Sequence, residues 1–218
     1  MTVTLDRPPT QLTGVTLTLV PLSHPSLRRV HHWDDQEALH KAVMGLFPST
    51  IPGDPEQRRA KNGILHRYDT PAHGPARLLI QHSTPLRPGL ATDTALMHTQ
   101  LQPLLVNLHV GTGTRFRVVL NAVRSQTRSH RRVPITDLDD LVTWGLQRLT
   151  AAGLDMIQLV DQPRTTLGTT GKSPLWTAQY DGHARITDPD TTRRALLNGL
   201  GRAKAYGCGL LSLAPDRA

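Results

Sequence analysis

The fold is decided by one run near the end of the chain, Gly199-Leu200-Gly201-Arg202-Ala203-Lys204-Ala205-Tyr206-Gly207-Cys208-Gly209, which continues into Leu210-Leu211-Ser212-Leu213. Two Gly-x-Gly pairs enclose two cations and one aromatic side chain. Residues 188–200 carry an acidic helix start and an amphipathic body, and residues 210–213 are typical of a short strand. P-loop and dinucleotide-binding folds place their glycine loop after a strand and before a helix, which is the reverse order. The run therefore excludes nucleotide binding of those two kinds.

Two interpretations of the glycine run remain. A backbone without Cβ atoms can approach a phosphate chain closely, and Arg202 and Lys204 would neutralise its charge. In the second interpretation, the glycines form only a helix C-cap and a loop tip. Four glycines with two interleaved cations favour the first interpretation.

The charge of the chain narrows the class of partner. Its 218 residues include 25 Lys and Arg against 17 Asp and Glu, a net charge of +8, which predicts a polyanionic partner. No apolar run reaches the about 18 residues of a membrane span, and neither a signal peptide nor a basic amphipathic anchor is present. We therefore expect nucleic acid rather than a membrane as the partner, and a cytoplasmic location.

Metal and cofactor chemistry finds no support in the residue pattern. The single cysteine, Cys208, allows neither an intrachain disulfide nor a Cys-x-x-Cys site, and is most simply a small buried residue. Eleven histidines occur without a metal-binding spacing, so we predict no metal site and no cofactor. Aromatic residues make up 4% of the chain, which argues against a base-stacking sheet.

The second half of the chain has the clearer pattern. Alternation predicts a strand over residues 114–123, followed by a basic loop over 124–132 and a helix over 135–152 with a leucine stripe. The remaining predictions are a strand over 156–160, a connector over 162–174, a hairpin of strands 175–180 and 183–187 around Asp181-Gly182, a helix ending near residue 200, and a strand over 210–213.

The first half predicts a related order. A strand is expected over residues 12–22, then a helix that begins with the capping box of Asp34 and Glu37 and stops at Pro48. Residues 49–57 are expected to form a loop, 62–68 and 76–82 two strands, and 101–108 either a helix or a strand. The halves are then βαββ(α)β and βαββαβ, an α+β fold of tandem ferredoxin-like (RRM-like, split βαβ) domains. We predict an extension over 1–11 and domains over 12–112 and 113–218.

Two motifs resemble a known family. The run from Gly201 to Pro215 resembles the glycine-rich loop of the CasE family, the CRISPR repeat endoribonuclease subunits of the type I-E Cascade complex. Leu39-His40, followed by Leu46-Phe47-Pro48, resembles the catalytic helix of that family. The resemblance implies tandem ferredoxin-like domains, metal-independent cleavage of precursor RNA within the repeat hairpin to 2′,3′-cyclic phosphate and 5′-hydroxyl ends, and continued binding to the mature crRNA. It also implies other Cascade subunits as partners.

The resemblance assigns His40 as the active-site histidine. An imidazole with a pKa near neutrality can act as the base or the acid of RNA cleavage, and Lys41, Arg202 or Lys204 could stabilise the phosphorane. The alternative for His40 is a boundary residue that only packs its ring. Family members often carry a tyrosine where this chain has Glu37, which either closes the capping box or raises the pKa of His40.

The predicted RNA contacts fall in three basic segments. The connector over 162–174 corresponds to the basic hairpin with which the family docks on the repeat stem, the glycine run is the second segment, and the 124–132 loop is either a third contact or a plain solvated loop. The predicted contacts are Arg124, Arg128, Arg131, Arg132, Arg164, Lys172, Gly201, Arg202, Lys204 and Gly207.

Three functions stay open on the sequence. The first is the metal-independent endoribonuclease. The second is a non-cleaving tandem ferredoxin-like RNA-binding protein, which Glu37 in place of the tyrosine favours. The third is an architectural protein that coats nucleic acid without sequence preference, which the net charge alone would allow.

Overall fold

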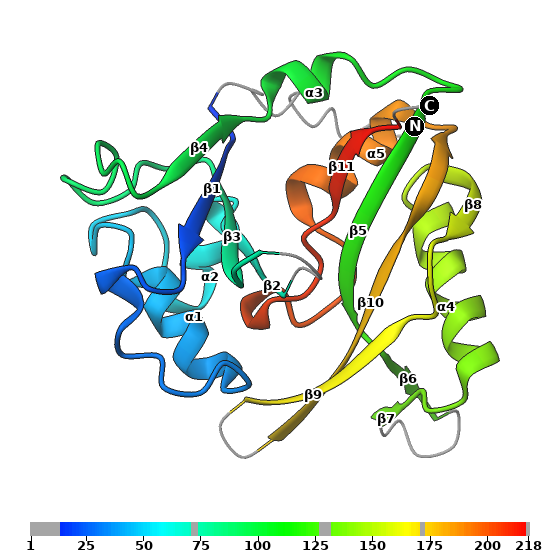
Figure 1. The fold of residues 1–218 in the computed structure, drawn as a ribbon, viewed down its shortest axis with the longest axis horizontal. Coiled ribbons are helices and arrows are strands. Elements are labelled where there is room, and N and C mark those ends of the chain that lie inside the picture. Colours follow the sequence, from blue (N-terminus) through cyan, green and yellow to red (C-terminus); the bar gives the residue numbers. More distant parts are fainter. Residues whose placement is uncertain (1–13, 71–73, 127–131, 171–172, 217–218) are drawn as a thin grey trace, which may run out of the picture.

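The computed structural model describes residues 14–70, 74–126, 132–170 and 173–216. Two antiparallel sheets stand side by side, and the segment around residue 205, orange-red in Figure 1, lies between them. The predicted extension over residues 1–11 lies outside the described residues, as do Arg128, Arg131 and Lys172.

The N-terminal sheet has the ferredoxin-like strand order. Its strands run β2-β3-β1-β4, and each pairs antiparallel with its neighbour. Helix α1 covers the sheet and buries Leu39 and Val43 in a core with Ile80. The elements are β1 (Thr16–Pro21), the 3-10 turn η1 (Pro25–Leu27), α1 (Gln36–Met44), α2 (Pro55–Lys61), β2 (Leu65–Asp69), β3 (Arg77–His82) and β4 (Met97–Gln100).

The C-terminal sheet repeats the same order as β11-β5-β10-β8, and β9 pairs with the N-terminal half of β10. This repetition confirms the predicted α+β fold of tandem ferredoxin-like domains. The elements are α3 (Gln102–Val106), β5 (Gly113–Asn121), β6 (Val123–Ser125), β7 (Arg132–Pro134), α4 (Leu138–Thr150), β8 (Leu154–Leu159), β9 (Arg164–Thr170), β10 (Ser173–Ile186), α5 (Pro189–Asn198), the 3-10 turn η2 (Lys204–Tyr206) and β11 (Ser212–Pro215).

The predicted hairpin turn at Asp181-Gly182 is wrong, because β10 runs straight through it. Gly182 lies opposite Phe116 of β5 on one side and Leu159 of β8 on the other. An added Cβ would come within 2.8 Å of the Phe116 ring and overlap the carbonyl of Gln158. The glycine is therefore required by the close approach of neighbouring groups and not by a turn.

Four short elements carry too little apolar periodicity to be predicted. Helix α2 begins at Pro55, inside the segment predicted as a loop, and exposed strand β4 was not predicted at all. The ends of the predicted basic loop pair as β6 and β7. The segment 101–108, which the sequence left open, contains helix α3, and its residues Leu101, Leu105 and Leu108 pack in the core of the C-terminal sheet.

Helix α1 begins one residue later than the capping box predicted. The carboxylate of Asp35, not that of Asp34, accepts hydrogen bonds from the backbone N–H groups of Glu37 at 3.1 Å and Ala38 at 3.0 Å. Glu37 is thus in the first turn and does not close a box on Asp34. The helix ends at Met44, before Pro48.

Candidate functional site

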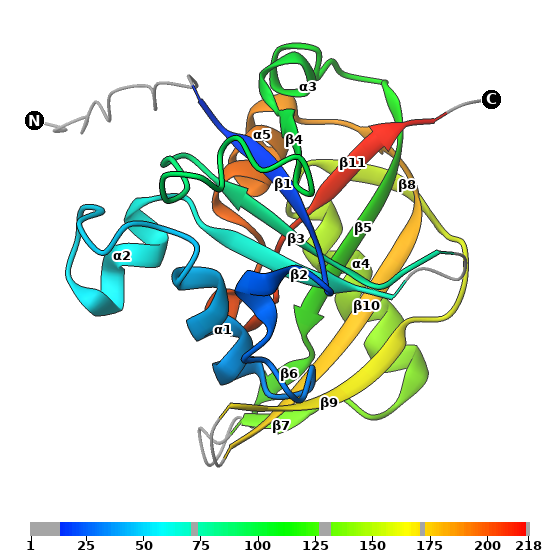
Figure 2. The same cartoon turned by 60° about the vertical axis from the view of Figure 1, so that its left-hand side comes forward.

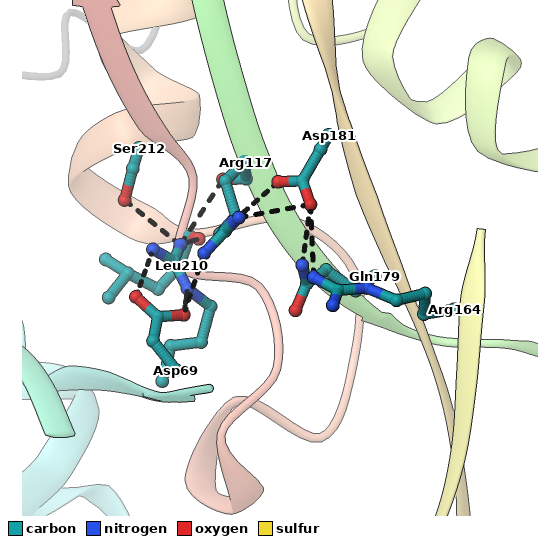
Figure 3. Close-up of polar contacts among 8 residues, drawn as sticks. Asp69, Arg117, Arg164, Gln179, Asp181, Leu210 and Ser212 are labelled. Carbon is teal, nitrogen blue, oxygen red and sulfur yellow. Dashed lines mark hydrogen bonds and ion pairs between the residues drawn. The ribbon is translucent and has the colours of Figure 1, made fainter. Parts of the chain in front are cut away.

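A network of charged side chains joins the two sheets beside the glycine run (Figure 3). Arg67 of β2 is buried and makes two bonds to Asp69, at 2.6 and 3.1 Å. Its Nη1 donates to the carbonyl of Leu210 at 2.9 Å and to the hydroxyl of Ser212 at 3.0 Å. The network therefore fixes the end of the glycine run against a strand of the other sheet.

The same network continues onto the C-terminal sheet. Arg117 of β5 lies 3.9 Å from the carboxylate of Asp69 and 2.5 Å from that of Asp181. Asp181 also accepts from Gln179 at 2.6 Å and lies 3.5 Å from Arg164, one of the predicted RNA contacts. Arg164 is therefore held in place by a carboxylate while its side chain stays about half exposed.

A cleft of about 290 Å³ borders this network, and Arg67, Arg164 and Gln179 of the network line part of it. Its walls come from four parts of the chain: Gln36 at the start of α1, Tyr68 of β2, Arg164 of β9, and Tyr206 and Gly207 of the glycine run. Figure 2 shows β9 passing beneath α1, and the N–H of Thr169 in β9 donates to the carbonyl of Asp34 at 2.9 Å. The β9–β10 arm and α1 thus hold the cleft between them.

The glycine run keeps its shape through left-handed backbone and close packing. Gly199 caps α5 with φ 70°, and the N–H of Leu200 donates to the carbonyl of Gly209 at 2.8 Å, which closes the loop on itself. A Cβ on Gly207 would lie 3.3 Å from the Gln36 side chain. Cys208 is buried between these glycines, and burial raises the pKa of its thiol to about 12.

His40 lies on the side of α1 that faces the glycine run. Its ring stands edge-on to that of Tyr206, with 6.2 Å between the ring centroids. The Nδ1 atom of His40 is buried and has no hydrogen-bond partner within the described residues. The imidazole is therefore half-buried against an aromatic ring, with one nitrogen shielded from water.

A second histidine lies deeper behind the glycine run. His66 of β2 is fully buried, and neither of its ring nitrogens has a hydrogen-bond partner in the described part of the chain. Its Nε2 is 3.7 Å from where a Cβ on Gly207 would be. Burial, with the charges of His40 and Arg59 adding to it, lowers the pKa of His66 to about 3, so its ring is neutral at pH 7.

The pKa of His40 is also lowered from its ordinary value. Burial is the main cause, and the positive charges of Arg59 and Lys41 act in the same direction. The carboxylate of Glu37 acts in the opposite direction but is outweighed. His40 therefore carries a neutral imidazole at pH 7, which is the form that accepts a proton.

Glu37 and Lys41 form an exposed pair one helical turn apart. The Lys41 ammonium lies 2.8 Å from the Glu37 carboxylate, and this hydrogen bond raises the pKa of Lys41. Of the two roles predicted for Glu37, the capping box is wrong. The upward effect on the pKa of His40 is present, although it does not decide the net direction.

The other predicted RNA contacts do not gather in the cleft. Gly201 and Arg202 line a separate pocket of about 250 Å³ on the C-terminal sheet, next to Trp144 and Arg148. Lys204 donates to the carbonyl of Asn198 at 2.8 Å, and burial lowers its pKa.

The basic segment over 124–132 lies elsewhere again. Arg124 is exposed and lies 2.7 Å from the carboxylate of Asp140 on α4. Arg132 is exposed at the start of β7, which pairs with the strand that carries Arg124. Both arginines therefore belong to the β6–β7 pair and neither lines the cleft.

Sequence reasoning missed four residues of this site: Gln36, Arg59, His66 and Tyr206. Tyr206 stands in the quoted glycine run, and its place between the two Gly-x-Gly pairs was the available signal. Arg59 belongs to the unpredicted α2, and His66 is one of several adjacent buried residues in β2, so alternation gave no hint of its surroundings.

Within residues 14–216, apart from the gaps given above, no three His, Cys, Asp or Glu side chains are grouped closely enough to hold a metal ion. No described helix combines the length and apolarity that crossing a membrane requires.

Comparison with known proteins decides the family. The family model described as CRISPR associated protein matches residues 16–215 of this chain. The chain belongs to this family. A curated relative, the CRISPR system Cascade subunit CasE of Escherichia coli (strain K12), is 25% identical over 194 residues, which cover 83% of this chain and 92% of the relative. The resemblance inferred from Gly201–Pro215 is confirmed.

Solved structures of the family share the fold. Thermus thermophilus Cse3, bound to an RNA representing a pre-cleavage complex, superposes with a TM-score of 0.71 at 20% identity, over 93% of this chain and all of the other. Cas6e from E. coli K-12 superposes with a TM-score of 0.59 at 20% identity, over 93% and 99%. A chain of a CRISPR RNA-guided surveillance complex, pre-nicking, gives 0.63 at 26% identity, over 93% and 100%.

Proposed function

We propose that this protein is an endoribonuclease that cleaves CRISPR precursor RNA within the repeat hairpin and stays bound to the mature crRNA as a Cascade subunit in the cytoplasm. Its relatives are a Cascade subunit and endoribonucleases whose structures contain RNA. The observation that carries the proposal is the half-buried imidazole of His40, edge-on to Tyr206 beside the glycine run.

The reaction uses the RNA itself as nucleophile. The 2′-hydroxyl oxygen of the nucleotide before the break attacks the phosphorus, and a new P–O2′ bond forms as the P–O5′ bond breaks. His40 accepts the proton of the 2′-hydroxyl, because its lowered pKa leaves the ring neutral at pH 7. The 5′-oxygen takes up a proton from solvent water as it leaves, and His40 afterwards releases its proton to solvent. The products are a 2′,3′-cyclic phosphate and a 5′-hydroxyl end. No metal ion takes part.

Positive charge beside His40 stabilises the pentavalent phosphorane. Lys41 is the next residue on α1, and its exposed ammonium is kept protonated by Glu37. A fixed cation near the developing charge lowers the barrier because it is already oriented when the charge forms. We assign this role to Lys41, with Glu37 as the group that positions it.

The RNA stem lies across the cleft and the β9–β10 arm. Arg164, Tyr206 and Gly207 form the central contact. Arg124 and Arg132 of the β6–β7 pair form a second contact farther along the stem. Contacts to phosphates position the RNA without reading its sequence.

A second candidate function is a non-cleaving RNA-binding subunit. It is favoured by one observation: Glu37, at the position where the resemblance implies a tyrosine, has its carboxylate occupied by Lys41. In this alternative the protein binds the repeat hairpin tightly and leaves the phosphodiester intact.

One assay separates these functions. The protein is incubated with repeat-hairpin RNA in excess EDTA, and the products are analysed for a 2′,3′-cyclic phosphate. Cleavage at one site that is blocked by a 2′-deoxy nucleotide before the break is the expected result. Tight hairpin-specific binding without cleavage would select the alternative, and equal binding to any duplex would overturn both.

A further inference from the structure

A second surface of α1 faces away from the cleft. It is a depression of about 550 Å³ between α1 and the segment that begins with η1, and we call it the η1 groove. Four of its nine lining residues are cations and none is acidic. The cations are Arg28 and Arg29, which follow η1, Lys41 of α1, and Arg87.

The three arginines of the η1 groove have no internal partner. Across the described residues, the side chains of Arg28, Arg29 and Arg87 take part in no ion pair or hydrogen bond. This differs from the predicted RNA contacts Arg124 and Arg164, each of which faces a carboxylate. Cations that are gathered in one hollow without counter-charges repel one another, so the arrangement favours an anionic ligand.

The groove rests on a rigid support. His24 caps η1 by accepting from the N–H of Ser26 at 3.2 Å, and its other nitrogen lies 3.0 Å from Asp93. Leu27 of η1 is buried in the core. The backbone N–H of Arg87 donates to the carbonyl of Leu46 at 2.9 Å, just beyond α1. The arginines therefore project from a backbone that is already fixed before any ligand binds.

Helix α1 connects the η1 groove to the site of His40. Ala38, Lys41, Ala42 and Gly45 line the groove, and with 3.6 residues per turn they share one side of the helix. His40 lies on another side, toward Tyr206. Lys41 is on the rim between the two, so the groove begins about one helix diameter, on the order of 10 Å, from the imidazole.

We propose that the η1 groove binds the phosphates of single-stranded RNA that flanks the repeat hairpin, as the strand leaves His40 and crosses α1. This rests on the proposed function. A volume of about 550 Å³ is that of a pocket for a small ligand, so it accommodates one or two nucleotides but not a duplex stem. The lining includes no aromatic side chain, so the strand is held by its backbone without base stacking.

The test compares RNAs with and without the flanking strand. The variant Arg28→Gln/Arg29→Gln/Arg87→Gln is titrated with three RNAs made uncleavable by one 2′-deoxy nucleotide: the hairpin alone, the hairpin with its flanking strand, and the flanking strand alone. We expect the Kd for the hairpin alone to stay within about twofold. The hairpin with its flanking strand should no longer bind more tightly than the hairpin alone. Its plot of log binding constant against log salt concentration should become shallower by about 2, since each of the three single-strand contacts contributes about 0.7.

The matched control removes the same charge elsewhere. Arg115, Arg185 and Arg194 belong to β5, β10 and α5, outside the η1 groove, and the variant Arg115→Gln/Arg185→Gln/Arg194→Gln should bind all three RNAs like the wild type. An equal loss for both hairpin RNAs, or no loss for either, would overturn the proposal. If the wild type does not cleave but the groove variant still loses affinity for the flanking strand, the proposed cleavage is refuted. Binding of the flanking strand in the η1 groove is then supported on its own.

Discussion

At His40, burial and two neighbouring cations lower the pKa together, and one carboxylate opposes them. The ring contacts Tyr206, which comes from a distant part of the chain. The glycine run brings the Tyr206 ring against His40, and its Gly207 leaves room for the buried His66. A histidine that only packs its ring at the helix boundary would not require this arrangement. These surroundings support the proposed role of His40 as a proton acceptor.

Replacing His40 tests its role directly. We expect His40→Ala to reduce single-turnover cleavage by on the order of 10²–10⁴-fold, because the variant lacks the group that accepts the 2′-hydroxyl proton. Hairpin affinity, measured by gel shift, should change less than about twofold. The control is His183→Ala, an exposed histidine paired with Asp216 on the C-terminal sheet, which should cleave normally. Equal losses of binding and cleavage in His40→Ala would contradict the assignment.

The pH profile of cleavage gives a second test of the same residue. A base must be deprotonated, so kcat/KM should rise with pH through the pKa of His40, at a midpoint below the ordinary 6.5. Removing the carboxylate in Glu37→Gln should move this midpoint to lower pH, and removing the cation in Lys41→Gln should move it to higher pH. The measurement is kcat/KM between pH 4.5 and 8. Midpoints that coincide in all three proteins would rule out titration of His40.

The sequence could predict His40 only through its resemblance to a family motif. The effects that set its pKa come from Arg59 on a helix with no apolar periodicity, and from burial beneath a loop that is more than 150 residues away in the sequence. Such effects depend on tertiary distance, which one sequence does not contain. The sequence shows that Tyr206 belongs to the quoted run, but it does not show that the Tyr206 ring lies beside His40.

At the scale of elements, hydrophobic patterns predicted the long helices and strands. Prediction failed where glycine can serve two purposes, either to form a turn or to make room for a neighbouring group. The leucine stripe of α4 predicted the helix correctly, within a few residues of its ends. Asp-Gly commonly marks a turn, yet at 181–182 the glycine makes room for the Phe116 ring inside a central strand. Glycine for conformation and glycine for space look identical in a sequence.

Gly145 of α4 is a second glycine used for space. A Cβ there would overlap the ring of Tyr180, whose hydroxyl donates to the carbonyl of Leu141 at 2.8 Å. Alanine favours a helix over glycine by about 1 kcal/mol, but we expect the overlap to win and Gly145→Ala to lower the free energy of unfolding by about 1–3 kcal/mol. Urea denaturation measures this. Gly113→Ala, whose added Cβ meets only ordinary contacts, should change stability by less than about 0.5 kcal/mol, and a stabilised Gly145→Ala would refute the argument.

At the scale of the molecule, the strand order repeats, and the proposed site lies between the two repeats. Apart from β4, the order of each sheet follows from the predicted pattern of strands and helices, so the tandem fold was accessible from the sequence. The bonds that dock the sheets were not, because they join residues such as Arg67 and Ser212 that are 145 positions apart. The domain boundary at residue 112 stays a prediction, and α3, which precedes it, packs on the core of the C-terminal sheet.

The docking network predicts how the two halves depend on each other. Arg67→Ala would leave the buried carboxylate of Asp69 without its main partner, and breaking a buried pair in this way costs about 3–5 kcal/mol. We expect that loss in the free energy of unfolding from urea titration. The control Arg124→Ala breaks an exposed pair and should cost no more than about 1 kcal/mol. Similar values for the two variants would mean that the network contributes little to holding the sheets together.

The single cysteine of the chain makes the protein convenient for labelling. Cys208 is fully buried and its thiolate is disfavoured, so maleimide reagents at neutral pH have little access to it. One or two cysteines introduced at exposed positions would then carry fluorophores or spin labels without removal of a native thiol. Distances across the inter-sheet cleft could be followed in this way in an otherwise unaltered protein.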